Sequence, residues 1–152
     1  MIERTVSNDI NEPSFYLFIT GNAGTGKSHL VRVIAEAIKL VKLKSGDDIK
    51  KPSILIMAPT ANAAFIIGGR TIDSILGFYP MNQNCYVPTD PGRMAQMKFQ
   101  YEDVEVLFID EISMVGSMKL SKINFRLQDL ADGENKLKFM GARSMVASGE
   151  DS

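Results

Sequence analysis

The chain has 152 residues, a length typical of one domain, and its 45% hydrophobic and 23% charged residues indicate a globular protein. Seventeen basic and eighteen acidic side chains nearly cancel, so the overall charge does not indicate nucleic-acid binding, although a local patch is compatible with it. Cys85 is the only cysteine, which excludes an intramolecular disulfide and a cysteine-based metal site. Because no segment resembles a membrane span or a signal peptide, we expect a soluble intracellular protein with no membrane partner.

A strand, a glycine-rich loop and a helix are predicted near the start of the chain. Residues 15–20 ("FYLFIT") have the apolar composition of a strand. Residues 21–28 ("GNAGTGKS") match G-x-x-x-x-G-K-[ST], the nucleotide phosphate-binding loop. Apolar residues then recur every three or four positions, which predicts an amphipathic helix from Lys27 to about Leu43, ended by Gly46. This order is the one that the loop requires, so a simple glycine-rich turn is the weaker interpretation.

One further strand and two short helices are predicted in the middle of the chain. Residues 53–58 ("SILIMA") suit a buried parallel strand. A turn leads into a helix within residues 59–67, closed by a glycine pair, and residues 71–78 favour another short helix. Residues 79–92 contain three prolines and two asparagines without an apolar period, which predicts a surface loop.

Two strands and one helix are predicted in the last third of the chain. Residues 104–109 ("VEVLFI") have the clearest strand pattern and lead into "DEIS". The apolar stripe of the next helix consists of Leu120, Ile123, Leu127 and Leu130. This stripe favours packing on a sheet, because there are too few repeats for a coiled coil. Residues 144–148 predict a final strand. Strands that alternate with helices predict an α/β fold of the P-loop NTPase type, with a parallel sheet and helices on both faces.

The glycine-rich loop carries the first predicted site. Its glycines allow successive backbone N–H groups to face the phosphates, and the following helix adds the positive end of its dipole. Lys27 would reach the β- and γ-phosphate oxygens of ATP, and the Ser28 hydroxyl would coordinate Mg²⁺. The predicted nucleotide-binding residues are Gly21, Asn22, Ala23, Gly24, Thr25, Gly26, Lys27 and Ser28.

The "DEIS" segment carries the second predicted site. Asp110 ends a buried strand of the sheet that also carries the loop, where a Mg²⁺-binding carboxylate belongs, and Glu111 could orient or deprotonate the attacking water. We therefore predict catalytic roles for Lys27, Asp110 and Glu111, and metal binding by Ser28 and Asp110. A solvated acidic pair is the alternative. The adjacent acidic residues also favour ATP hydrolysis over a GTP switch.

Four ordered motifs carry a resemblance to a known family. The runs "GNAGTGKSHL", "APTANAAF", "GGRTIDSILGF" and "LFIDEISMV" closely resemble the Pif-one-like and RecD-like superfamily-one DNA helicases. The resemblance implies a single, incomplete RecA-like lobe at residues 15–149, with tails at 1–14 and 150–152. It also implies ATP-dependent 5′→3′ DNA unwinding in repair, recombination and telomere maintenance, and a location in the nucleus or the mitochondrion. Ala142 replaces the second glycine of a family Gly-Gly pair, and Glu150 stands in place of an aspartate.

The resemblance further implies contacts with single-stranded DNA. The positions concerned are Thr60, Asn62, Ala63, Thr71 and Ser74. Asp73 stands where the family usually has a histidine, which changes the chemistry of the second of these segments. Because Thr60 precedes a predicted helix, it is equally well explained as a helix cap, and that role is compatible with a phosphate contact.

The resemblance also implies parts that these 152 residues do not contain. Members of the family hydrolyse ATP between two RecA-like lobes, and an arginine of the second lobe, worth about 10³ to 10⁵ in turnover, reaches the γ-phosphate. We therefore expect the isolated chain to bind ATP, to hydrolyse it slowly at most, and to need a second lobe in cis or in trans. The alternatives are a non-catalytic nucleotide- or DNA-binding fragment and a different P-loop ATPase.

Overall fold

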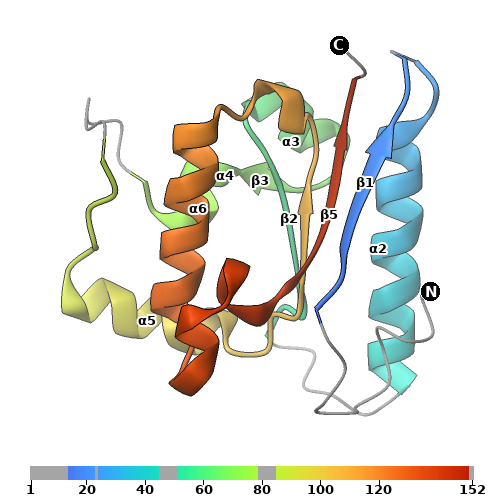
Figure 1. The fold of residues 1–152 in the computed structure, drawn as a ribbon. Helices are drawn as coiled ribbons and strands as arrows, with labels where there is room; N and C mark the ends of the chain where they lie inside the picture. Colours follow the sequence, from blue (N-terminus) through green and yellow to red (C-terminus); the bar gives the residue numbers. More distant parts are fainter. Residues whose placement is uncertain (1–13, 23, 45–50, 79–84, 151–152) are drawn as a thin grey trace.

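Five parallel strands form one sheet at the centre of the computed structural model, which describes residues 14–22, 24–44, 51–78 and 85–150. The strands are β1 (Tyr16–Thr20), β2 (Ile54–Ala58), β3 (Arg70–Thr71), β4 (Val106–Ile109) and β5 (Ser144–Gly149). Their order across the sheet is β1-β5-β4-β2-β3 (Figure 1). The predicted α/β fold with a parallel sheet is confirmed.

Helices cover both faces of the sheet. They are α2 (Lys27–Lys44), α3 (Ala61–Ile66), α4 (Ile72–Leu76), α5 (Pro91–Tyr101) and α6 (Ser117–Leu130). Three short 3-10 helices, η1 (Ile112–Met114), η2 (Gly133–Leu137) and η3 (Phe139–Ala142), complete the described elements. Figure 1 shows α2 on one side of the strands and α5 and α6 on the other. Within the described part of the chain, no helix has both the length and the apolar character that a membrane crossing requires.

Alternate residues of the strands build two separate apolar layers. The layer beneath α2 consists of Val31, Ala35, Ile38, Ile54, Val106, Phe108 and Val146. The opposite layer joins α4, α5 and α6 to the intervening strand residues Leu55, Met57, Leu107 and Ile109. All four residues of β4 are buried, as expected for a parallel strand that is covered on both faces. Because side chains alternate between the two faces along a strand, the same alternation determines on which face of the sheet a residue at the strand end lies.

The structure confirms all four predicted strands and the long helix, and the ends of each lie within two residues of the predicted ends. Gly46, the predicted end of α2, lies outside the described residues. The two-residue strand β3 was not predicted, because such a short segment has no period and depends on its pairing with β2.

The prediction of a loop through Gly92 was wrong at its C-terminal end, since α5 begins at Pro91. Residues 79–84 of that loop lie outside the described part. The Asp90 carboxylate caps α5 by accepting a hydrogen bond from the Arg93 N–H at 2.9 Å, and proline suits the first helical position. Only Met97 and Tyr101 of α5 are fully buried, so its apolar period is weak.

A tight corner before β5 places three consecutive residues in the left-handed backbone region. Met140, Gly141 and Ala142 have φ values of 52°, 63° and 62°. Gly141 has no space for a side chain, because a Cβ atom there would lie 2.4 Å from the Leu127 carbonyl oxygen. Ala142 carries a Cβ in a conformation that L residues usually avoid. The corner is therefore strained at the position where the resembling family has its second glycine.

We expect the substitution Ala142→Gly to raise the free energy of unfolding by about 1 kcal/mol. The left-handed conformation penalises a Cβ by roughly 1–2 kcal/mol, and the greater chain entropy of glycine in the unfolded state offsets part of the gain. Urea unfolding would measure the change. The matched control is Ala95→Gly, at an exposed position inside α5, which should lower stability by about 1 kcal/mol. A loss of stability in both variants would contradict the strain at Ala142.

Candidate nucleotide-binding site

The glycine-rich loop connects the carboxyl end of β1 to the first turn of α2 (Figure 1). Gly24 and Gly26 have φ values of 77° and 86°, which a residue with a side chain rarely adopts. The Thr25 hydroxyl donates to the Asn22 carbonyl at 2.8 Å and braces the loop from within. Ala23, one of the predicted nucleotide-binding residues, lies outside the described part of the chain.

Lys27 folds back across the loop that precedes it. Its Nζ donates to the carbonyl oxygens of Gly21 at 2.7 Å and Asn22 at 2.8 Å. The ammonium is thereby held over the loop backbone, and both of these acceptors are neutral. Phosphate oxygens accept stronger, charge-assisted hydrogen bonds than carbonyl groups do, so a phosphate group can replace these partners.

The carboxylate of Asp110 connects the "DEIS" segment to the glycine-rich loop. The Ser28 hydroxyl donates to Asp110 Oδ2 at 2.8 Å, although 82 residues separate the two in sequence. Asp110 follows β4 and, by the alternation along that strand, joins Val106 and Phe108 on the face covered by α2. The fold thus brings together the two residues for which sequence reasoning predicts metal binding.

The Asp110 carboxylate has a second hydrogen-bond partner, Ser148, which was not among the predicted site residues. The Ser148 hydroxyl donates to Asp110 Oδ1 at 2.5 Å, and Ser148 is completely buried. Ile109 of β4 pairs with Ala147 of β5, so the residues that follow them lie side by side. The available signal was a serine at the end of a predicted strand, but which strand neighbours β4 could not be read from the sequence.

The environment of Asp110 fits a divalent cation. Asp110 is only 2% exposed, and among the described residues the hydrogen-bond partners of its carboxylate are two neutral hydroxyl groups and no cation. A buried carboxylate is normally compensated by a paired charge or a metal ion. Among the described residues, no group of three or more acidic, histidine or cysteine side chains is arranged so that it could hold a metal ion. This sparse donor set suits Mg²⁺, which usually takes one or two protein groups together with substrate phosphates and water.

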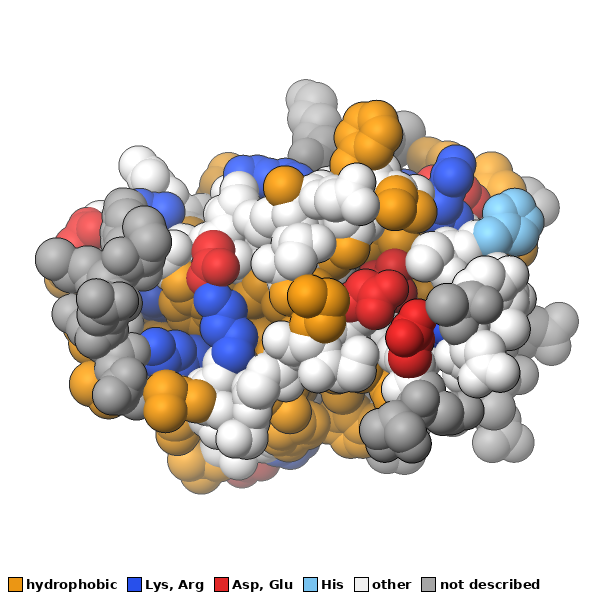
Figure 2. All heavy atoms as spheres, turned by 90° about the horizontal axis from the view of Figure 1, so that it is seen from above, with side chains coloured by type: hydrophobic (Ala, Val, Ile, Leu, Met, Phe, Trp, Pro, Cys, Tyr) orange, Lys and Arg blue, Asp and Glu red, His pale blue; other side chains and the backbone are white. Residues whose placement is uncertain are grey.

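Glu111 occupies a strained position directly after Asp110. Its backbone has φ 53° and ψ 45°, in the left-handed region, and the residue precedes the short helix η1. Such conformations cost about 1–3 kcal/mol in a residue with a side chain, and they concentrate at functional sites. Figure 2 looks onto the carboxyl ends of the strands and shows acidic side chains gathered near the middle of this face. Glu111 is half-buried, so its carboxylate remains partly accessible to solvent.

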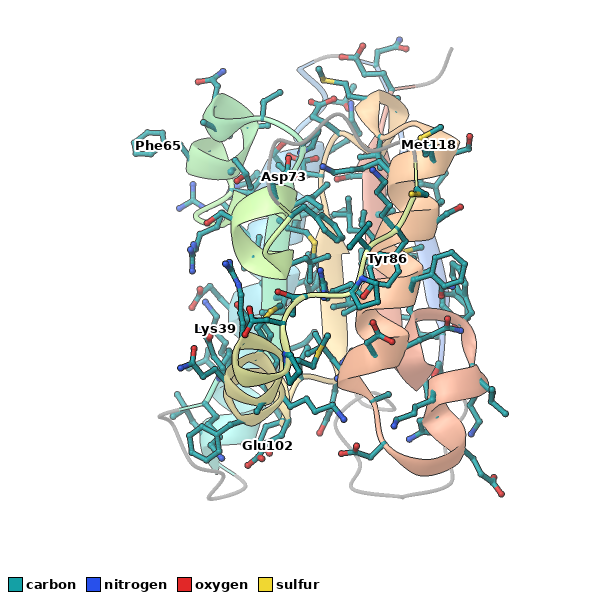
Figure 3. The ribbon with its side chains drawn as sticks, turned by 90° about the vertical axis from the view of Figure 1, so that its left-hand side faces the viewer. Lys39, Phe65, Asp73, Tyr86, Glu102 and Met118 are labelled. Carbon is teal, nitrogen blue, oxygen red and sulfur yellow. The ribbon has the colours of Figure 1, made fainter. Side chains whose placement is uncertain are left out.

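The first segment predicted to contact DNA lies at the start of α3. The Ala63 N–H donates to Thr60 Oγ1 at 3.2 Å, which confirms Thr60 as the cap of this helix. Asn62 is exposed, whereas the side chain of Ala63 is buried against Ala58 and Ile67. Any contact from Ala63 therefore has to involve its backbone. Phe65 of the same helix is 85% exposed and points away from the molecule in Figure 3.

The second predicted DNA segment surrounds the start of α4. Thr71 caps this helix by accepting a hydrogen bond from the Ser74 N–H at 3.3 Å. Arg70 donates from Nη2 to the Ser74 hydroxyl at 2.6 Å. Asp73, labelled in Figure 3, forms an ion pair with Lys119 of α6. The residue that stands in place of the family's histidine is therefore neutralised within the chain.

Comparison with known proteins places this chain in a family. The PIF1-like helicase family matches residues 1–151. The ATP-dependent DNA helicase PIF1 of Candida albicans is 34% identical over 137 residues, which cover 88% of this chain and 14% of that protein. A crystal structure of Bacteroides Pif1 bound to ssDNA has a TM-score of 0.62 at 27% identity, covering 98% of this chain and 31% of the Bacteroides chain. A Bacteroides Pif1 structure in complex with ADP-AlF3 and ssDNA has a TM-score of 0.64 at 23% identity, a likeness of fold.

The chain spans less than a third of the length of these relatives. Over that span it has the same fold, with the glycine-rich loop and the Asp110 segment side by side at the carboxyl ends of β1 and β4. The family match extends across nearly the whole of the present sequence. The chain therefore belongs to the PIF1-like helicase family.

Proposed function

We propose that this chain is the first ATPase lobe of an ATP-dependent DNA helicase. In this proposal it binds ATP with Mg²⁺ and, together with a second RecA-like lobe, couples ATP hydrolysis to 5′→3′ DNA unwinding. The observation that carries the proposal is the hydrogen bond between Ser28 and Asp110, because it joins the phosphate-binding loop to the acidic strand end. The neighbouring position of Glu111 supplies a candidate base at the same end of the sheet.

In this proposal, each side chain of the site has its own role in binding and hydrolysing ATP. The loop backbone and Lys27 would hold the phosphates of ATP, with the Lys27 ammonium exchanging the Gly21 and Asn22 carbonyls for phosphate oxygens. Ser28 and Asp110 would hold Mg²⁺, which when bound neutralises part of the phosphate charge. Glu111 would accept a proton from the water that attacks the γ-phosphate.

DNA binding by this chain is part of the same proposal. Bacteroides Pif1 has been crystallised with ssDNA, and this lobe matches that structure over 98% of its length. We infer that Thr60, Asn62 and Thr71 face the strand, with backbone groups of Ala63 beside them. We further propose that the whole protein acts in DNA repair, recombination and telomere maintenance, in the nucleus or the mitochondrion.

ATP turnover by the purified chain, with and without single-stranded DNA, tests the enzymatic part of the proposal. DNA-stimulated hydrolysis that disappears in Lys27→Ala would show that this lobe already couples DNA to ATP, with a missing arginine supplied by self-association. ATP binding without turnover would favour a lobe that is inactive until a second lobe joins it. Absence of ATP binding would overturn the proposed function.

Single-stranded DNA affinity should fall steeply as the salt concentration rises. Each phosphate neutralised by a cation contributes a slope of about −0.7 to log affinity against log salt for single strands. Fluorescence anisotropy of a labelled oligonucleotide would measure the slope. We also propose Arg70, beside Thr71, as a phosphate contact, so Arg70→Ala should make the slope shallower by about 0.7. Lys98→Ala, in α5 and paired with Asp132, is the matched control and should not change it. A flat salt dependence would remove the DNA-facing roles of Thr60 and Thr71.

A further inference from the structure

The two oxygens of the Asp110 carboxylate have different partners. Oδ2 accepts from Ser28, whose position at the start of α2 ties this oxygen to the phosphate-binding loop. Oδ1 accepts from Ser148, a residue of β5 with no solvent exposure. One oxygen is thus directed to the nucleotide site and the other into the sheet.

The backbone of Ser148 lies within the sheet, next to β1. It pairs with Ile19 of β1, and on its other side β5 pairs in parallel with β4 up to Ala147. The following residue, Gly149, lies against η1, because a Cβ there would come within 3.1 Å of Ile112. The sheet, and not the phosphate-binding loop, therefore determines where the backbone that carries this hydroxyl lies.

This arrangement restricts the rotation of the carboxylate. The terminal torsion of an aspartate is broad and roughly two-fold, so an unsupported carboxylate can turn either oxygen towards a metal. With Oδ1 engaged by Ser148, Oδ2 is the oxygen that faces Ser28. The Ser28 hydroxyl has one proton and two lone pairs, so it can donate to Oδ2 and still offer a lone pair to a cation.

We propose that Ser148 is a positioning residue for Mg²⁺ at the nucleotide site. Its hydroxyl holds the inner oxygen of Asp110 and thereby presents the outer oxygen, together with the Ser28 hydroxyl, to the ion that accompanies ATP. The inference rests on the proposed function, because it requires a nucleotide with Mg²⁺ at this site. Partners that orient a metal-binding carboxylate typically contribute about 10- to 100-fold in metal affinity when they are removed.

A purely structural role for Ser148 makes a different prediction. If the hydroxyl only satisfied a buried carboxylate, its removal would lower the stability of the fold and the affinity for nucleotide with and without Mg²⁺ to a similar degree. A positioning role changes the dependence on Mg²⁺ and leaves metal-free nucleotide binding intact. The two roles are separated by measuring nucleotide binding as a function of Mg²⁺.

The test uses the whole chain and a fluorescent ATP analogue that is not hydrolysed. At a fixed analogue concentration, the half-saturating Mg²⁺ concentration should rise about 10- to 100-fold in Ser148→Ala, while the affinity measured in EDTA stays within about twofold. Ser148→Cys, with a weaker donor of similar size, should shift in the same direction. The matched control is Ser144→Ala on the same strand, whose hydroxyl accepts from the Phe15 N–H at 3.3 Å, away from Asp110. This control should leave the Mg²⁺ dependence unchanged.

The possible results distinguish a positioning role of Ser148 from a structural role, and both of these from a failure of the proposed function. An unchanged Mg²⁺ midpoint in both Ser148 variants would overturn the inference and leave the proposed function intact. A parallel loss of affinity with and without Mg²⁺, accompanied by a lower thermal unfolding midpoint, would also overturn it, in favour of a structural role. Failure of the unsubstituted chain to bind the analogue under either condition would overturn the proposed function and this inference with it.

Discussion

Replacing Lys27 with alanine will weaken ATP binding by more than about 100-fold. The ammonium lies over the loop backbone, held by the Gly21 and Asn22 carbonyls, so it is already placed to meet the β- and γ-phosphates. A hydrogen bond to a charged group contributes about 1.5–3 kcal/mol, and two such bonds correspond to roughly 100-fold or more in affinity. Equilibrium titration with a fluorescent ATP analogue in the presence of Mg²⁺ would measure the loss.

The matched control for this variant is Lys39→Ala in the same helix. Lys39 is exposed and pairs with Glu36 one turn earlier, so its removal should leave ATP affinity unchanged. The thermal unfolding midpoint of Lys27→Ala should stay close to that of the unsubstituted chain, because the released carbonyls lie at a partly exposed loop that water can reach. Retention of micromolar ATP affinity in Lys27→Ala would remove the assignment of residues 21–28 as the nucleotide site.

The substitution Glu111→Gln will keep ATP and Mg²⁺ bound while removing the hydrolysis that the chain performs. Glutamine preserves the size of the side chain and makes similar demands on the left-handed backbone at this position, but it cannot accept a proton from water. A positioned general base contributes about 10²- to 10⁴-fold to the rate. Because turnover by the isolated lobe is expected to be slow, phosphate release should be followed under single-turnover conditions with protein in excess over ATP.

Glu134→Gln provides the comparison for Glu111. Glu134 is exposed in η2, which precedes β5 and so lies away from the carboxyl ends of the strands, and its substitution should not affect turnover. Unchanged hydrolysis in Glu111→Gln would mean that the base lies elsewhere. If ATP binding were lost as well, Glu111 would be assigned to holding the nucleotide or its metal instead of activating water.

Much of this fold and site could be predicted because the signals are local. The period of apolar residues along 27–43 and the strand runs before the loop and before Asp110 each depend on neighbours in sequence. The same holds for Thr60, since a helix cap is formed by a residue and the N–H three positions later. The start of α5 was also encoded locally, by Asp90 and Pro91, but three prolines nearby and a weak apolar stripe favoured a loop.

The amino-acid sequence by itself determined the phosphate-binding loop, the acidic strand end and the parallel α/β fold, since each follows from residue type and spacing over short stretches. Only the tertiary structure decided that β5 lies between β1 and β4, and hence that Ser148 donates to Asp110. It also decided the left-handed corner at 140–142, where the Leu127 carbonyl leaves no space for a side chain at Gly141. The order of strands and the close approach of distant backbones depend on packing between segments far apart in the chain, which no local pattern records.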